Sequence, residues 1–264
     1  MKVIDLITHL SGLSYYKDFM LDGIRAEGLE DLMEDIAEQP LEFEPGERYF
    51  YGLGHDVLGR VIEVVSGVSF QAFMQTYIFE PLEMNHTKFF LTPKEKELML
   101  PLFVRNEKIE GFNETGITGI NDLITYDMEF KVAYGSLGLI STPKDFSNFC
   151  SMLINRGKFK NKRILSPESV YELIVRYADG PHSNDNDFMG VYNGLGVYVL
   201  DNSSLMDLMA GKGIFGHGGY QSTEFFIDPK NDIYGVFLNR SLTDYNHRFY
   251  FIKAVYDAFT NQPY

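Results

Sequence analysis

The chain has 264 residues, of which 45% are apolar, and it contains 22 Phe and 17 Tyr, enough for one large core or two small ones. Its formal net charge of −14 argues against binding to nucleic acid, which requires a basic face, and disfavours an anionic membrane surface. The single cysteine, Cys150, excludes an internal disulfide and a thiolate metal cluster.

The N-terminal residues show no pattern of a targeting segment. Met1 to Leu6 turn acidic and polar too early for a signal peptide. No run of about 18 apolar residues is present, so no membrane span is expected. As it stands the chain is expected to be cytoplasmic, and a longer form with an export signal would leave the compartment open.

Three helices are expected in the first third of the chain. Residues 27–38 alternate apolar and acidic sides with a helical period, which predicts a solvated acidic face and not a metal site. The next helix, over 57–65, stops at Gly67 and points five residues inward: Val57, Leu58, Val61, Ile62 and Val65. The third starts at Ser69, ends before Pro81 and is expected to bury Phe70, Phe73, Met74, Tyr77 and Ile78.

Two further helices have clear starting signals. Thr142 is the expected N-cap of a helix with Pro143 in its first turn, which ends near Gly157. Cys150 lies in this helix at apolar spacing, so it is expected to be a buried small hydrophobe. Ser166 opens the next helix. Residues 85–135 show no clear period and are expected to be irregular.

After residue 190 the apolar period changes from helical to strand-like. Short aromatic or β-branched runs at 195–200, 223–228 and 233–238 predict strands, with a hairpin turn at 229–232. A closing helix follows, with Phe249, Ile252, Val255, Tyr256 and Phe259 on one face. We therefore predict one α+β domain over 1–264, mainly helical over 1–190, with antiparallel strands and the closing helix over 191–264.

The segment from Phe215 to Tyr220 places three glycines around His217. Glycine lacks Cβ and adopts positive φ at little cost, so such a cluster is either a tight turn or a place where a ligand lies against the main chain. The local pattern leaves both interpretations open.

Taken together, seven blocks of the chain resemble the serine β-lactamase-related proteins, in order and over nearly the whole length. The blocks are Thr8–Leu13 (Thr-His-x-Ser-Gly-Leu), Phe43–Arg48 with Tyr51, Asp56–Glu63, Phe79–Met84, Gly138–Thr142, Arg163–Pro167 and His217–Gly219. The chain is most similar to class C-like β-lactamases, family VIII carboxylesterases and D-amino-acid peptidases. The resemblance implies a β-lactamase/transpeptidase-like fold, with an antiparallel sheet flanked by helices and a helical region.

The resemblance also implies acyl transfer: the serine of a Ser-x-x-Lys motif attacks a carbonyl, a tyrosine and the lysine handle its proton, and backbone amides hold the oxyanion. Tyr51 matches the family's general base or proton relay. His217, Gly218 and Gly219 match the strand edge that accepts substrate, with the N–H of Tyr220 as an oxyanion donor, in a cleft that faces Tyr51. Leu53 replaces an asparagine common in the family, which weakens a β-lactamase assignment.

No cofactor or metal ion is expected. His9, His55, His86 and His182 show no ligand spacing, and His247 is expected on the surface of the closing helix. The expected partner is a small acyl substrate: an ester, a β-lactam or a peptide-like amide.

One departure from the family bears on mechanism. The family's Ser-x-x-Lys helix precedes the Thr8–Leu13 block by several dozen residues, and here only seven residues precede that block. We therefore expect a truncated chain, without the first helix, the first strands and the nucleophile helix, and inactive by itself. Two other Ser-x-x-Lys strings, at 14–17 and 141–144, match the roughly one expected by chance; Ser14 with Lys17 is kept as a weak nucleophile candidate.

Three functions fit these observations: a hydrolase completed by a longer chain or a partner, a non-catalytic member that binds acyl, peptide-like or cell-wall ligands, and a gene fragment without a function. Loss of the nucleophile helix would uncover an apolar face. Low solubility, rearrangement or a homodimer through that face is therefore expected.

Overall fold

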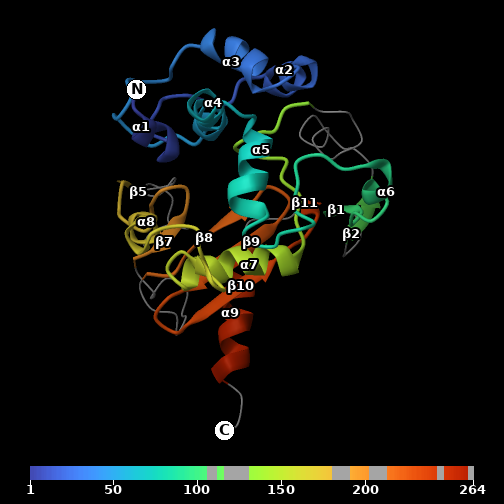
Figure 1. Ribbon diagram of the computed structural model, residues 1–264, viewed down its shortest axis with the longest axis vertical. Coiled ribbons are helices and arrows are strands. Elements are labelled where there is room, and N and C mark those ends of the chain that lie inside the picture. Colours follow the sequence, from blue (N-terminus) through green and yellow to red (C-terminus); the bar gives the residue numbers. More distant parts are fainter. Residues whose placement is uncertain (106–111, 116–130, 180–190, 202–212, 243–246, 261–264) are drawn as a thin grey trace. The chain divides into compact units, whose positions relative to one another are not determined.

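The computed structural model describes residues 1–105, 112–115, 131–179, 191–201, 213–242 and 247–260 (Figure 1). The chain divides into two compact units, unit 1 (residues 1–99 and 117–141) and unit 2 (residues 100–116 and 142–264). His182 lies outside the described residues.

The described elements of unit 1 are helices, arranged around α4. In chain order they are α1 (Val3–Ile7), α2 (Phe19–Arg25), α3 (Leu29–Ala37), α4 (Gly54–Ser66), α5 (Phe70–Met74), the π-helix η1 (Gln75–Phe79) and α6 (Pro93–Lys96). Helix α4 contacts α1, α3 and α5. It therefore packs against three other helices of the unit, and Tyr51, one of the predicted site residues, lies just before its N-terminal end.

The acidic helix is confirmed as α3, with Leu29, Leu32 and Ile36 buried and its carboxylates on the other side. Helix α4 ends, as predicted, at Gly67, whose φ of 74° is the left-handed C-cap conformation. The expectation that Val65 points inward is wrong: it is 82% exposed. Val65 lies in the last turn of α4, beyond the part of the helix that its neighbours cover.

A π-turn changes which residues of the next helix are buried. Ser69 caps α5 as predicted, but the helix continues as η1, in which each turn holds about one residue more than an α-turn. The extra residue rotates the buried face of the helix. Phe79 is therefore 2% exposed, whereas Tyr77, which was predicted to be buried, is 57% exposed. Among the described helices, none by itself is long and apolar enough to cross a membrane; the bent pair of α4 with α5–η1 (81°) passes that test on length and composition alone.

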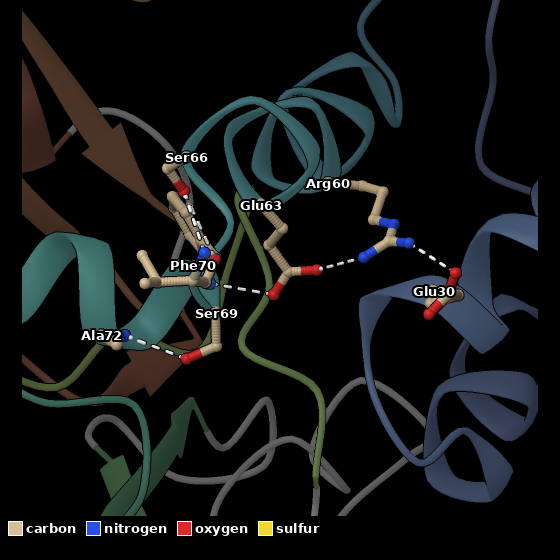
Figure 2. A network of polar contacts seen from close by, with 8 residues as sticks. Glu30, Arg60, Glu63, Ser66, Ser69, Phe70 and Ala72 are labelled. Carbon is tan, nitrogen blue, oxygen red and sulfur yellow. Dashed lines mark hydrogen bonds and ion pairs between the residues drawn. The ribbon is translucent and has the colours of Figure 1, made fainter.

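A polar network joins three helices of unit 1 (Figure 2). Arg60 on α4 pairs with Glu30 on α3 at 2.5 Å and with Glu63 one turn further along at 3.1 Å. Glu63 in turn accepts the backbone N–H of Phe70 at 2.9 Å, which is one of the N–H groups at the start of α5 that lack a partner within the helix. The Arg60–Glu63 pair thus fixes where α3 and α5 attach to α4.

Unit 2 contains two larger sheets and a short hairpin. Its described elements are β1 (Leu102–Arg105), β2 (Phe112–Thr115), α7 (Pro143–Ile154), β3 (Lys158–Phe159), β4 (Lys162–Arg163), α8 (Pro167–Glu172), β5 (Ala178–Asp179), β6 (Val191–Asn193), β7 (Tyr198–Leu200), β8 (Phe215–Gly219), β9 (Thr223–Asp228), β10 (Ile233–Phe237), β11 (Ser241–Leu242) and α9 (His247–Thr260). The main sheet has the order β10-β9-β8-β7-β6-β5, with every neighbouring pair antiparallel. In the smaller sheet, β11-β1-β2, the β1–β11 pair is parallel. The stretch 85–135, expected to be irregular, thus contributes α6, β1 and β2.

Two helices cover opposite faces of the main sheet, and two consecutive residues of β9 show this. Phe225 contacts Phe146 of α7 (ring centroids 5.2 Å apart), whereas Phe226 contacts Phe251 of α9 (5.8 Å). Successive strand residues point to opposite faces, so α7 and α9 lie on either side of the sheet. Cys150 on α7 is fully buried, as predicted, and burial raises its thiol pKa to about 12.

Helix α9 confirms part of the predicted apolar face. Ile252 is fully buried and Tyr256 is 6% exposed, and both belong to the core cluster with Phe226. Phe259, predicted on that face, is 59% exposed, because it lies in the last turn of α9.

The predicted hairpin between β9 and β10 forms around a buried aspartate. Asp228 is 1% exposed and accepts hydrogen bonds from the N–H groups of Lys230 (2.9 Å) and Asn231 (3.1 Å), from the Asn231 side chain and from the Tyr256 hydroxyl. A carboxylate with this many donors fixes the turn and attaches it to α9.

Candidate active site

The predicted site residues fall in both units: Tyr51 belongs to unit 1, and His217 to Tyr220 belong to unit 2. Each group is described within its own unit.

Tyr51 lies just before α4, and the Thr8–Leu13 block is bonded to the residues that lead up to it, from Glu42 to Phe50. Three backbone hydrogen bonds join the two: Phe50 N–H to His9 O (2.9 Å), Gly46 N–H to Leu10 O (2.8 Å) and Glu42 N–H to Gly12 O (2.9 Å). The first two sequence blocks of the resemblance are separated by some 30 residues in the chain, and these bonds therefore bring them together next to the tyrosine.

Close backbone contact fixes the position of Tyr51. A Cβ at Gly52 would lie 1.9 Å from the carbonyl oxygen of Leu13, so only glycine fits at this position. Leu53, the next residue, is 1% exposed and points into the core. The side chain at this position therefore presents no donor to a substrate, whereas Tyr51 itself is 42% exposed.

An imidazole lies against the Tyr51 ring. His9 is 5% exposed, and its ring centroid is 4.4 Å from that of Tyr51. Its φ of 57° is in the left-handed region, which is uncommon for a residue other than glycine. His55, at the start of α4, is 4.5 Å from His9, and its Nε2–H donates to Ile7 O at 3.2 Å.

Burial favours the neutral form of three titratable side chains near the His9 and Tyr51 rings. Burial lowers the pKa of His55, a shift that its bond to Ile7 opposes. Burial, and then the neighbouring Tyr51 phenol, raise the pKa of Tyr49 and of Tyr15. Near neutral pH the aromatic cluster around Tyr51 therefore adds no charge of its own from these three side chains.

A buried acid lies in the first turn of α4. Asp56 is fully buried and accepts the backbone N–H of Ser136 at 3.1 Å and its hydroxyl at 2.7 Å. Burial raises the pKa of Asp56 to about 6, although the hydrogen bonds from Ser136 and Gly135 act in the opposite direction. The Asp56–Ser136 pair joins residues 133–136 to α4, the helix that follows Tyr51 in the chain.

We predict that Asp56→Asn makes unit 1 more stable relative to the wild type as the pH rises. The folded pKa is above the unfolded value of about 4, so the contribution of Asp56 to stability is fully present below about pH 4 and is lost as the pH rises through 6. Asparagine keeps an acceptor for the Ser136 N–H and offers a donor to its hydroxyl. Between about pH 5 and 7.5, urea unfolding should show the difference between the Asp56→Asn and wild-type chains moving by roughly 1 kcal/mol in favour of the variant. A pH-independent difference would contradict the raised pKa.

In unit 2, strand β8 carries the other predicted residues. Its ladder with β9 runs to Gly219↔Thr223, but its ladder with β7 ends at Tyr198↔Gly216. Strand β8 therefore continues past β7 through Gly218 and Gly219. An extended ligand can add to such an edge by backbone hydrogen bonds.

Two local contacts shape this edge. His217 Nδ1–H donates to the carbonyl oxygen of Gly218 at 2.5 Å, which places a ring proton on Nδ1. A Cβ at Gly219 would lie 2.1 Å from the hydroxyl oxygen of Thr223, the residue opposite it on β9. Cross-strand packing is thus one physical reason for glycine at 219.

Tyr220 follows β8 in the turn that leads to β9, with 55% of its surface exposed. Ser222 closes the turn: its φ is 62°, its N–H donates to Gly219 O at 3.1 Å, and its hydroxyl donates to Ser241 O at 3.0 Å. The β8–β9 turn is therefore bonded to the first residue of β11.

Neither Ser-x-x-Lys string has the geometry of a nucleophile helix. Ser14 and Lys17 lie before α2, and Ser14 donates to a Glu42 carboxylate oxygen at 3.0 Å. Ser141 precedes the N-cap of α7 and bonds the Thr87 hydroxyl at 2.8 Å. A serine and a lysine three residues apart share one face only within a helix, and neither string provides that arrangement.

Within the described ranges, no group of three or more His, Cys, Asp or Glu side chains is placed to hold a metal ion. The contacts of His9 with Tyr51 and of Asp56 with Ser136 were not predicted from the sequence. The available signal was that His9 and Asp56 both lie inside blocks of the resemblance.

Comparison with known proteins agrees with this fold. The beta-lactamase family model matches residues 1–256. A protein of Salmonella heidelberg (strain SL476), provisionally named D-alanyl-D-alanine carboxypeptidase, is 24% identical over 257 residues, which cover 90% of this chain and 56% of the relative. The chain thus spans about half the length of the curated relatives that it matches.

Solved structures give the same result. The hydrolase EstCE1, described as having promiscuous acyltransferase activity, superposes with a TM-score of 0.79 at 21% identity, covering 98% of this chain and 71% of that one. An octameric penicillin-binding protein homologue from Pyrococcus abyssi superposes with a TM-score of 0.70 at 23% identity, covering 97% and 55%. At these identities the likeness shows a β-lactamase/transpeptidase-like fold, and the matched family model shows that the chain belongs to the beta-lactamase family of serine hydrolases.

Proposed function

We propose that this chain supplies the proton-handling tyrosine and the substrate-binding strand of an acyl-transfer site. Tyr51 is the proton relay. Gly218 and Gly219 form the strand edge beside which the acyl group lies, His217 hydrogen-bonds the substrate side, and the N–H of Tyr220 donates to the oxyanion. The observation that carries the proposal is the scaffold around Tyr51, where two separate sequence blocks bond to each other and leave the tyrosine 42% exposed.

The proposed reaction needs a serine that neither Ser-x-x-Lys string supplies in the required geometry. We propose that the serine and its lysine come from a segment outside these 264 residues. The serine hydroxyl attacks the substrate carbonyl carbon and its proton passes to the Tyr51 phenolate; the bond to the leaving group then breaks, and Tyr51 returns the proton to that group. Water next hydrolyses the acyl-serine ester, releasing the acid and the free serine. The phenolate requires a neighbouring cation to lower its pKa from about 10, a role that fits the lysine.

An ester is the substrate class to test first. Leu53 is buried and offers no donor for the amide side chain of a β-lactam or for a peptide. Hydrolysis of a short-chain ester requires no such contact, because its acyl group carries no amide side chain. Hydrolysis of a D-peptide amide or a β-lactam is the broader form of the same proposal.

We expect a chromogenic short-chain ester to be turned over by a longer chain that includes the residues encoded upstream, and not by the 264-residue chain alone. Both proteins would be assayed with the ester and with a chromogenic cephalosporin, with Ser14→Ala in the short chain as the matched control. Turnover by the short chain that Ser14→Ala abolishes would contradict the proposal and assign the nucleophile to Ser14. Ligand-dependent thermal stabilisation of both forms without turnover would favour a non-catalytic binding protein.

The homodimer expected from the sequence stays part of this proposal. Two adjacent apolar side chains in the last turn of α4, Val64 (67% exposed) and Val65 (82%), would be part of the surface through which two copies associate. Light scattering on the same two preparations measures whether the short chain dimerises and whether the longer chain does not.

A further inference from the structure

His9 is bonded to the chain on both sides of Tyr51. Its carbonyl oxygen accepts the N–H of Phe50 at 2.9 Å, and its ring Nδ1 accepts the N–H of Gly52 at 3.5 Å. One residue therefore holds both neighbours of the candidate proton relay, although it lies some 40 positions earlier in the sequence.

The backbone of His9 is adapted to this arrangement. Its φ of 57° costs a non-glycine residue roughly 1 kcal/mol or more, and such a conformation persists only where the surroundings enforce it. Here the carbonyl group and the imidazole of His9 both accept hydrogen bonds from the same three-residue segment, 50–52. This left-handed residue is one of six non-glycine residues with positive φ recorded for the described part of the chain.

The hydrogen bond to Gly52 also orients the ring. Nδ1 points toward the backbone of Gly52, and the ring lies 4.4 Å from that of Tyr51. The titratable rings that face it are those of Tyr49 (5.7 Å), Tyr51 (4.4 Å) and His55 (4.5 Å). The His9 ring is therefore packed among three aromatic side chains while its Nδ1 is turned toward the Gly52 backbone.

We propose that His9 is a positioning residue: it fixes the backbone on both sides of Tyr51 and packs its ring against the phenol, so that the hydroxyl is held in one orientation for proton transfer. The catalytic meaning of this inference rests on the proposed function of Tyr51, whereas the positioning itself does not. A phenol held in one rotamer loses less entropy in the transition state than one that must be oriented first.

Two variants separate the two contacts of His9. Asparagine tolerates the left-handed conformation and has a side-chain acceptor for the Gly52 N–H, so His9→Asn removes only the ring contact. His9→Gly also accommodates φ of 57°, but removes both the ring and the side-chain acceptor. Glu83→Gly is the matched control, because Glu83 has a φ of 56° and follows η1 in the same unit.

The test is NMR of the 264-residue chain labelled with ¹³C in its tyrosine rings. The signal that disappears in Tyr51→Phe is assigned to Tyr51. We expect the Tyr51 signal to move toward the shift of a freely rotating tyrosine and to sharpen in His9→Gly, to change less in His9→Asn, and to stay in place in Glu83→Gly. An unchanged Tyr51 signal in a folded His9→Gly chain would overturn the proposal. If His9→Gly does not fold, an unchanged signal in His9→Asn serves as the same refutation for the ring contact.

Turnover distinguishes failure of this inference from failure of the proposed function. In the form of the protein that hydrolyses the ester, His9→Asn should lower kcat roughly 10-fold or more with KM within about twofold of wild type. If activity falls only as much as the amount of folded protein, kcat per folded molecule is unchanged. That result would mean that His9 has a purely structural role. If the NMR result holds but Tyr51→Phe does not affect turnover, positioning stands and the role proposed for Tyr51 fails.

Discussion

Tyr51→Phe is expected to reduce ester turnover by about 10²- to 10⁴-fold, the usual contribution of a positioned general acid–base group. Phenylalanine keeps the ring that packs against His9, whose centroid is 4.4 Å away, and removes only the hydroxyl. Because 42% of Tyr51 is exposed, we expect the substitution to change the free energy of unfolding by less than a core substitution would. The measurement is kcat/KM in the form of the protein that turns over the ester, together with thermal unfolding of both proteins.

The control for this variant lies in the same cluster. Tyr49→Phe removes the hydroxyl of another tyrosine near His9, whose ring is 5.7 Å away, and should leave kcat within a few-fold of wild type. Comparable losses in the two variants would mean that the cluster acts as a whole. Unchanged kcat/KM in Tyr51→Phe would remove Tyr51 from the mechanism.

Gly52→Ala should destabilise unit 1 by about 1–3 kcal/mol and displace Tyr51, since overpacking at a rigid contact costs this much. The new Cβ would lie 1.9 Å from the Leu13 carbonyl oxygen and 3.0 Å from the Ser14 Cα, and both are backbone atoms that no side-chain rotation can move. Urea unfolding measures the free energy of unfolding, and the ¹³C signal of Tyr51 reports the displacement.

Gly28→Ala is the matched comparison. Gly28 has an extended φ of 175°, and a Cβ there would meet nothing within 4 Å. Alanine at 28 should therefore change the free energy of unfolding by no more than the loss at an N-cap position, a few tenths to about 1 kcal/mol. If alanine at 52 is tolerated as well as alanine at 28, the close approach of the Leu13 backbone does not constrain the tyrosine segment.

The residues at which helices begin were predicted from the sequence better than the residues that the helices bury. Thr142 and Ser166 act as N-caps as expected, because capping depends on a side-chain oxygen and an N–H three residues later. Burial depends on what covers each turn. Tyr77 and Phe259 fit the apolar period but are exposed, the first because a π-turn rotates the face and the second because it lies at the end of α9. Neither cause is visible in the period itself.

For the candidate site, the resemblance proposed Tyr51 and the β8 residues, but gave no indication of the contacts that hold them in place. The contact of His9 with Tyr51 and the Asp56–Ser136 bonds join residues some 40 and 80 positions apart. Such pairings are set by how the chain folds back on itself, and a single sequence gives no local pattern for them. His9 was considered only for metal-ligand spacing. Such spacing does not reveal a positioning role that depends on the left-handed backbone conformation of this residue.

The buried cysteine can report how often unit 2 opens locally. Cys150 is the only thiol in the chain, it is fully buried on α7, and burial raises its pKa to about 12. A thiol-specific reagent can therefore modify the folded protein only during moments when α7 lifts from the sheet. The labelling rate, compared with that of the unfolded chain, measures how often this opening occurs, and so gives the free energy of local opening in unit 2 separately from events around Tyr51.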